Sequence, residues 1–174
     1  MLYKTIYADP PWNEEGGGKI KRGASKHYSL MKTAEIKNLQ VSKLADENCH
    51  LYLWVTNNFL KDGLEVMETW GFRYVTIITW LKDRIGLGQY YRGLTEHCLF
   101  GIKGKLPYKV ENQKRCQGTT GFYANKTKHS KKPLQMRNMI ELVSYPPRIE
   151  LFARERYDGW DAWGNEIKES LHGF

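Results

Sequence analysis

The sequence predicts an α/β domain with a mainly parallel central sheet flanked by helices. Short runs rich in Val, Ile, Thr and aromatic residues alternate along the chain with stretches whose apolar residues recur at helical spacing. Strands that alternate with helices indicate crossover connections, which favour a parallel sheet. At 174 residues with 41% hydrophobic residues, the chain is long enough to bury a core, and residues 1–174 are expected to form one domain.

Six strands are predicted from runs of β-branched and aromatic residues that end at Gly, Pro, Asn or a charged residue. The second of these runs is strongly apolar, as expected for a buried strand. The predicted strands are Leu2–Ala8, His50–Val55, Arg73–Trp80, Glu96–Ile102, Arg148–Phe152 and Trp160–Trp163.

Three helices are predicted. Thr33 is the expected N-cap of the first, and Asn57 or Asn58 caps the second, which Gly71 ends. The pair Lys132-Pro133 opens the third, where the missing proline N–H costs nothing. The side chains expected to face the core are Ile36 and Leu39, then Leu60, Leu64, Met67 and Trp70, and finally Leu134, Met139, Ile140 and Val143.

Two loops concentrate positive charge. The chain has a net charge of +8, yet residues 102–132 hold nine Lys or Arg against one acid, and residues 19–32 hold five and no acid. Such clusters are typical of a protein that binds a polyanion, although solvated lysine-rich loops are the alternative. We therefore predict basic, substrate-contacting loops at about 13–32 and 103–131. The second loop shows no clear periodicity and is expected to be mobile.

The stretch Asp9-Pro10-Pro11-Trp12 follows the first predicted strand and is the chemically most specific feature of the sequence. Proline lacks an N–H and holds the preceding residue extended, so the backbone leaves the sheet abruptly. This exposes the Asp9 carboxylate and the Pro10 carbonyl as acceptors beside the flat ring of Trp12. Two acceptors next to a stacking ring suit a planar base with an exocyclic amino group. A strand-ending turn with a core Trp is the alternative.

Several classes of protein are disfavoured. The chain contains no GxGxxG or GxxxxGK[ST] motif, which argues against dinucleotide and P-loop sites. Three cysteines without CxxC spacing indicate reduced thiols in a cytoplasmic protein, and the five dispersed histidines make a metal centre unexpected. No apolar run approaches the length of a membrane span and no signal peptide is evident, so no membrane partner is expected.

Motifs spread over nearly the whole chain then indicate a family. The chain resembles S-adenosylmethionine-dependent adenine-N6 methyltransferases of the DPPW type, related to the catalytic subunit of the mRNA-adenosine methyltransferase, in their short bacterial or phage form. Each motif is weak alone, but their order and spacing are specific. They are Tyr7-Ala8-Asp9-Pro10-Pro11-Trp12, His27-Tyr28 with Met31, Leu53-Trp54-Val55-Thr56, Trp70-Gly71-Phe72, Glu96-His97-Cys98-Leu99, His129-Ser130-Lys131-Lys132-Pro133 with Ile140-Glu141, Glu150-Leu151-Phe152-Ala153-Arg154, Gly159-Trp160 and Trp163-Gly164-Asn165-Glu166.

The resemblance implies a Rossmann-like methyltransferase fold in circularly permuted order, with the catalytic motif first and the cofactor-binding strand last. It implies S-adenosylmethionine as cofactor, with the Lys132 ammonium on its methionine carboxylate. A carboxylate at a strand end, here Glu150, is also a sound ribose ligand in its own right. The residues expected to bind the cofactor are Ala8, Asp9, Lys132, Glu150, Arg154, Asn165 and Glu166. Individually, each could instead be structural: Lys132 a surface lysine, Glu150 with Arg154 an ion pair, Asn165 a turn residue.

The implied reaction is direct methyl transfer to adenine N6. Asp9 and the Pro10 carbonyl would accept hydrogen bonds from the amino group, with Pro11 and Trp12 completing the catalytic tetrapeptide. The nucleic acid is expected to be DNA rather than RNA, and its base to lie between Trp12 and Tyr28. The residues expected to contact the substrate are Trp12, Lys26, Tyr28, Tyr91, Arg92, Glu96 and His97, of which Glu96 and His97 could equally be buried structural partners.

The chain departs from the family pattern at two places. The glycine-rich cofactor loop is replaced by Ala153-Arg154-Glu155-Arg156, and the first strand begins at residue 2, where larger relatives carry a preceding segment that touches the cofactor adenine. Side chains are therefore expected to do more of the binding. A catalytically inactive nucleic-acid-binding scaffold and a cytosine-N4 methyltransferase are the alternatives, and a homodimer or a partner subunit stays open.

Overall fold

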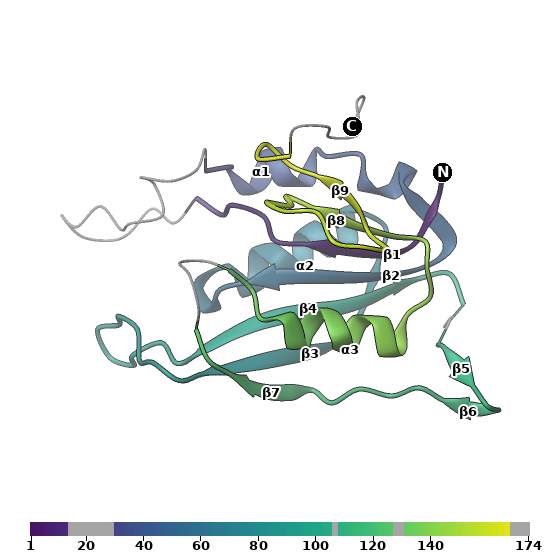
Figure 1. Cartoon of the computed structure of the whole chain (residues 1–174). Coiled ribbons are helices and arrows are strands. Elements are labelled where there is room, and N and C mark those ends of the chain that lie inside the picture. Colours follow the sequence, from purple (N-terminus) through teal and green to yellow (C-terminus); the bar gives the residue numbers. More distant parts are fainter. Residues whose placement is uncertain (14–29, 106–107, 127–130, 168–174) are drawn as a thin grey trace.

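A seven-stranded mixed sheet forms the centre of the molecule (Figure 1). The structure is a computed structural model that describes residues 1–13, 30–105, 108–126 and 131–167. The strands follow the order β7-β3-β4-β2-β1-β8-β9. Their bounds are β1 Tyr3–Ala8, β2 Ala45–Val55, β3 Arg73–Lys82, β4 Thr95–Lys103, β7 Gly121–Ala124, β8 Arg148–Leu151 and β9 Asp161–Trp163, and a separate hairpin joins β5 Val110–Glu111 to β6 Lys114–Arg115.

The sheet is mainly parallel, as predicted. The pairs β1–β2, β1–β8, β8–β9 and β3–β7 are parallel, and β4 runs antiparallel to both β2 and β3. The carboxyl ends of β1, β2, β3 and β8 therefore meet the start of β4 at one edge of the sheet. This is the edge at which parallel α/β sheets bind their ligands.

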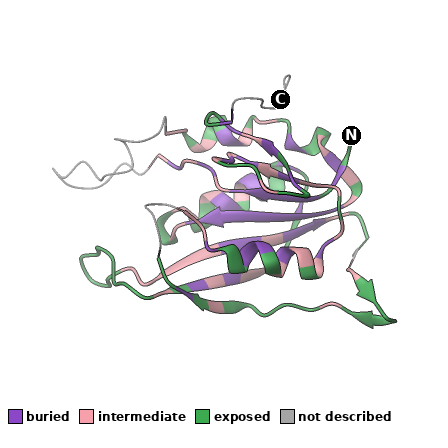
Figure 2. Cartoon of the chain, viewed as in Figure 1, coloured by how far each residue is buried: buried purple, intermediate pink, exposed green. Residues whose placement is uncertain are grey.

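Helices cover both faces of the sheet (Figures 1 and 2). Along β2, Leu51 and Leu53 point to one face and Tyr52 and Trp54 to the other, as the period of a strand requires. The first face packs on α1 and α2, the second on α3. The helices are α1 Thr33–Lys37, α2 Leu60–Thr69 and α3 Leu134–Val143, with 3₁₀ turns η2 Val41–Lys43 and η3 Asn57–Phe59.

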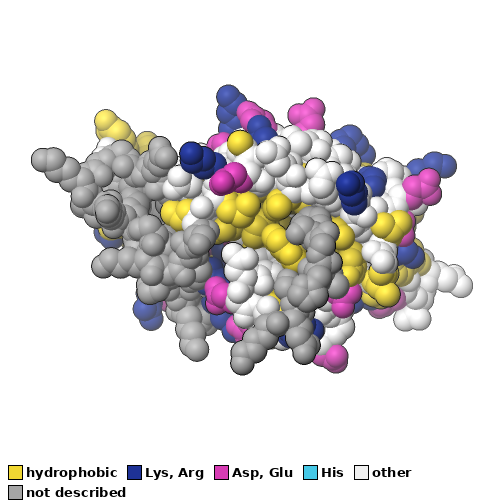
Figure 3. Space-filling view, turned by 90° about the horizontal axis from the view of Figure 1, so that it is seen from above, with side chains coloured by type: hydrophobic (Ala, Val, Ile, Leu, Met, Phe, Trp, Pro, Cys, Tyr) yellow, Lys and Arg dark blue, Asp and Glu magenta, His cyan; other side chains and the backbone are white. Residues whose placement is uncertain are grey.

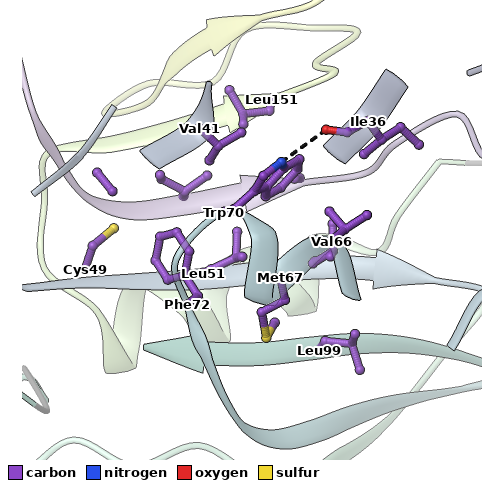
Figure 4. Packing of buried hydrophobic residues seen from close by; sticks show 14 of the residues in the cluster. Ile36, Val41, Cys49, Leu51, Val66, Met67, Trp70, Phe72, Leu99 and Leu151 are labelled. Carbon is purple, nitrogen blue, oxygen red and sulfur yellow. Dashed lines mark hydrogen bonds between the residues drawn. The ribbon is translucent and has the colours of Figure 1, made fainter. Parts of the chain in front are cut away.

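Trp70 joins two helices at the centre of the first face (Figure 4). Its ring is 1% exposed beside Val66 and Met67, and its Nε1 donates a hydrogen bond of 3.1 Å to the carbonyl of Ile36. Gly71 follows with φ of 85°, the left-handed conformation that ends a helix. The prediction that Trp70 belongs to the core is confirmed.

The predicted core faces of α2 and α3 were partly wrong. Leu60 and Leu64 are each 38% exposed, and Gly63, Val66 and Met67 face the sheet instead. Asn57 and Asn58 lie in the turn η3, so neither caps α2, whose N-cap is Phe59. The buried positions recur at 63, 66, 67 and 70, so the buried face of α2 is centred nearer Val66, and Leu60 and Leu64 lie at its margin. In α3 the buried residues are Met136, Arg137 and Ile140, whereas Leu134 is 57% exposed. At α1 the N-cap is Lys32 rather than Thr33.

Part of the segment 103–131 is regular structure, contrary to the loop that we predicted. Residues 121–124 form the edge strand β7, parallel to β3, and the indole Nε1 of Trp80 donates 2.8 Å to the carbonyl of Ala124. A strand of four residues gives little periodicity to detect. Basic residues of this segment also have partners in the chain, for example Lys109 with Glu111 and Arg115 over the ring of Tyr108.

The surface mixes apolar and charged groups. From above, a band of hydrophobic side chains crosses the molecule with Lys, Arg, Asp and Glu around it (Figure 3). None of the described helices has both the length and the apolar character needed to cross a membrane.

Candidate active site

Asp9 directly follows β1, at the edge where the parallel strands end. The backbone turns there as predicted: the N–H of Trp12 donates 2.9 Å to the carbonyl of Pro10, and the N–H of Met31 donates 2.8 Å to the carbonyl of Pro11. One lone pair of the Pro10 carbonyl is thus used internally, and the second remains available as an acceptor. The turn is held from both sides before any substrate arrives.

The ring of Trp12 lies in the core. It is 7% exposed and stacks on Phe59 at 5.2 Å between ring centroids, and its Nε1 donates 2.9 Å to the carbonyl of Trp54. This is the arrangement that the core-Trp alternative described. A contact between Trp12 and a base stays a prediction and would use the edge of the ring, because Phe59 covers one face and only 7% of the residue is exposed.

Asp9 is the first of four charged side chains that alternate in sign. The Lys132 Nζ lies 2.8 Å from Oδ2 of Asp9 and 3.1 Å from Oε1 of Glu96, and the Lys82 Nζ lies 2.9 Å from Oε2 of Glu96. Lys132 also sits 5.2 Å from the ring centroid of Trp54. The side chains of Lys132 and Glu96 are only 12% and 15% exposed, so these ion pairs are poorly screened by solvent.

These charged groups shift one another's pKa values. Burial raises the pKa of the Asp9 carboxyl above its usual range, and Lys132 opposes the shift without cancelling it. Burial would also raise the pKa of Glu96, but Lys132 and Lys82 outweigh it and hold that pKa below its ordinary value. Lys132 loses solvation yet keeps a raised pKa, because Asp9 and Glu96 both favour its charged form. Lys132 is therefore a fixed cation beside Asp9.

Glu150 lies near the end of β8, next to β1, and is held by a residue that sequence reasoning missed. Arg137 of α3 donates from its guanidinium to Oε2 of Glu150 at 2.5 Å, and its charge lies over the rings of Tyr157 at 3.7 Å and Trp160 at 4.7 Å. Burial raises the pKa of Glu150, and Arg137 opposes this. The one sequence signal for Arg137 was its position three residues before Ile140, on the same helix face.

A small hollow that is open to solvent lies between the Asp9–Lys132 pair and the Arg137–Glu150 pair. Asp9 and Lys132 line it together with Glu150, Arg154 and Tyr157. Polar and charged groups that converge on one hollow are a feature of small-molecule sites. Four of the seven predicted cofactor residues therefore lie around one cavity, although they come from distant parts of the sequence.

The other predicted residues lie elsewhere. Ala8 is fully buried in β1, and Asn165 and Glu166 are exposed beyond β9, with Oε1 of Glu166 at 3.8 Å from Nε of Arg154. His97 of β4 contacts Thr79 Oγ1 through Nδ1 at 3.0 Å, as expected of a structural partner. Tyr91 and Arg92 are exposed on the connection between β3 and β4, and Lys26 and Tyr28 lie outside the described residues.

The chain is similar to several known proteins. The family model described as MT-A70 matches residues 3–166. The chain is 30% identical to the type II methyltransferase M.MunI of Mycoplasma sp, over 97% of this chain and 79% of the relative. It is 31% identical to the N(6)-adenosine-methyltransferase MT-A70-like of Arabidopsis thaliana and 30% identical to the human N(6)-adenosine-methyltransferase catalytic subunit METTL3. The chain spans only 24% and 29% of the lengths of those two proteins.

Proposed function

Because the chain belongs to the MT-A70 family, we propose that it transfers a methyl group from S-adenosylmethionine to the N6 amino group of adenine in nucleic acid. The observation that carries this proposal is the juxtaposition of Asp9 with Lys132, Glu150 and Arg154 around one hollow. Methyl transfer between two substrates needs a group that accepts hydrogen bonds from the target amine and polar groups that bind the cofactor, both at the same edge of the sheet.

The residues around the hollow fit the cofactor. The Glu150 carboxylate at the end of β8 would accept hydrogen bonds from the ribose hydroxyls, with Arg137 holding it in place. Arg154 and the Lys132 ammonium supply positive charge for a carboxylate. The backbone of Ala8 and Asp9 and the side chains of Asn165 and Glu166 would complete the set.

Asp9 and Pro10 would orient the target amine. The adenine amino group is a poor nucleophile because its lone pair is delocalised into the ring. Hydrogen bonds from that group to the Asp9 carboxylate and the free lone pair of the Pro10 carbonyl favour a tetrahedral nitrogen and accept charge as it develops. Lys132 occupies Oδ2 of Asp9, and a carboxylate has further acceptor capacity. When bound, S-adenosylmethionine supplies the methyl group on a sulfonium centre.

The alternating lysines and carboxylates that connect Asp9 to Lys82 would hold the Asp9 carboxylate in position for the target amine. Glu96 is neutralised by Lys82 on one side and holds Lys132 on the other, so the ammonium stays beside Asp9. A carboxylate fixed in this way loses little freedom when the amine binds, which is the orientation contribution to catalysis. Lys82 therefore acts through its neighbours rather than on the substrate.

We favour DNA as the nucleic acid. The chain matches most of the length of the type II methyltransferase M.MunI but less than a third of METTL3. RNA is the second candidate, supported by the adenosine-methyltransferase relatives. The two basic segments would hold phosphates in either case. A catalytically inactive scaffold that binds nucleic acid is the non-enzymatic alternative, and the presence of Asp9 argues against it.

One experiment tests the reaction. The purified chain is incubated with methyl-labelled cofactor and either DNA or RNA, and the digest is analysed for N6-methyladenine. Wild type and the exposed control Asp158→Ala should label adenine, whereas Asp9→Ala should fold normally and not label. Equal labelling by Asp9→Ala would remove this mechanism. Nucleic-acid binding without labelling and without cofactor binding by calorimetry would support the scaffold instead.

A further inference from the structure

The connection between β3 and β4 is an ordered hairpin extension. The N–H of Lys82 donates 2.9 Å to the carbonyl of Leu94, and the N–H of Gly86 donates 2.6 Å to the carbonyl of Gly93. A second bond of 3.1 Å runs from the N–H of Gly93 to the carbonyl of Leu87. These bonds continue the β3–β4 pairing beyond the sheet, so residues 83–94 project as a defined arm.

The tip of this arm requires a tight backbone. The Nε of Arg92 donates 3.1 Å to the carbonyl of Gly86 across the arm. At Gly88, a side-chain carbon would lie 2.0 Å from the carbonyl oxygen of Tyr91, so only glycine fits there. Glycine at position 88 therefore allows a tight turn after which the next residues point outward.

The side chains at the tip are large, apolar and almost fully exposed. Tyr90 is 93% exposed, Tyr91 is 92% exposed and Leu87 is 77% exposed. The arm appears as a continuous exposed segment in Figure 2. Scattered exposed apolar residues are ordinary, but three together on a projecting tip indicate a contact surface.

The arm begins next to the charged residues that connect Asp9 to Lys82. Its two strands carry Lys82 and Glu96, and Glu96 binds the Lys132 that contacts Asp9. The arm leaves the edge of the sheet at which β1 ends (Figure 1), and Asp9 directly follows β1. At about 3.3 Å per residue, residues 83–87 carry the tip roughly 15 Å beyond Lys82. A ligand whose adenine sits at Asp9 would therefore meet the arm with its neighbouring nucleotides.

Size and chemistry identify the partner. Two tyrosine rings offer roughly 300–500 Å², whereas a stable protein interface buries about 800 Å² on each partner. The tip is thus too small for such an interface on its own. Stacking on bases needs only one ring for each base. Arg84, whose Nε lies 3.4 Å from Oδ2 of Asp83, and Arg92 are exposed beside the tip and suit phosphates, so the surface fits nucleic acid.

We propose that the tip at Tyr90 and Tyr91 enters the base stack of a duplex beside the target adenine and fills the gap that the extruded base leaves. This deepens the proposed function and rests on it, because it assigns a duplex as the substrate class. An enzyme that acts on a base in a duplex must unstack that base, and stacking of the tyrosines would offset this cost. Extrusion of a base from a single strand would leave no gap between paired bases for the tip to fill.

The test compares three substrates of the same sequence: a duplex, a duplex with an abasic site opposite the target adenine, and a single strand. For the double variant Tyr90→Ala with Tyr91→Ala, we expect kcat/KM on the duplex to fall about 10–100-fold, the value of one lost stacking contact or more. On the other two substrates the loss should be within about threefold. The double Phe variant should resemble wild type, because stacking does not need the hydroxyl.

Tyr74→Ala is the matched control, since Tyr74 is 43% exposed at the other end of β3. Equal losses on all three substrates, no loss on the duplex, or the same loss in Tyr74→Ala would overturn the proposal. Wild-type protein that methylates only single strands would also overturn the proposal. A change of oligomeric state in the Ala variant, measured by analytical ultracentrifugation, would instead identify the tip as a contact between copies.

A second measurement separates the tip from the reaction. A duplex with 2-aminopurine in place of adenine throughout one strand should become more fluorescent with wild type and not with the Ala variant, without any cofactor. If this rise occurs but wild type labels no nucleic acid, the proposed methyl transfer is wrong and the tip stands. If wild type labels the duplex and both proteins give the same fluorescence, the tip proposal is wrong and the reaction stands.

Discussion

Replacing Arg137 by Met tests whether the buried ion pair holds Glu150 in place. Arg137 and Glu150 have side-chain exposures of 9% and 16% and lie 2.5 Å apart. The substitution keeps a long apolar side chain between Tyr157 and Trp160 but removes the charge. Glu150 would then be a buried carboxylate without its cation.

The size of the effect follows from burial. Removing one partner of a buried ion pair costs about 3–5 kcal/mol, because the remaining charge stays desolvated. Burial already raises the pKa of Glu150, and loss of Arg137 raises it further. A carboxyl whose pKa is higher in the folded than in the unfolded state binds more protons when folded, so the free energy of unfolding falls as pH rises through that window. The defect should therefore be larger at pH 7 than near pH 5.

Urea unfolding at both pH values, followed by tryptophan fluorescence, measures this effect. Lys37→Met is the control, because its pair with Glu65 is more exposed, at 29% and 44%, and should contribute about 1 kcal/mol or less. The double variant Arg137→Met with Glu150→Gln should recover most of the loss at pH 7. A defect that is independent of pH and unchanged in the double variant would refute the reasoning and indicate lost packing alone.

Three other changes have defined outcomes. Lys132→Met should lower methyl transfer at pH 7 by about 100-fold. Its pH–rate profile should also move to higher pH, because the pKa of Asp9 rises without the neighbouring cation. A profile at the same pH as wild type would contradict this. Gly63→Ala places a carbon 2.3 Å from Cγ1 of Val55 and should cost about 1–3 kcal/mol in urea unfolding, whereas Glu68→Ala on the exposed side of α2 should cost little. Burial lowers the pKa of His50 to about 4, so stability should fall by roughly 2–4 kcal/mol as pH drops from 6.5 to 4, and His50→Gln should flatten that slope.

Local patterns predicted the elements well where steric rules dominate. The strand before Asp9, the stop at Gly71 and the proline start of α3 follow from backbone preferences of single residues. The buried face of α2 did not follow, because packing against the sheet decides which of its apolar residues are buried, and Leu64 lies at the margin of that face. Strand β7 escaped detection because its pairing with β3 comes from a distant part of the chain.

The site divides in the same way. The sequence by itself determined that an acid, two prolines and a Trp end a buried strand, since proline sterics act over neighbouring residues. Only the tertiary structure decided that Asp9 meets Lys132, which lies 123 residues away, and that Glu96 connects Lys132 to Lys82. Strand order and burial bring these charges together and raise or lower their pKa values. Such contacts depend on the whole sheet, so no local pattern of the chain encodes them.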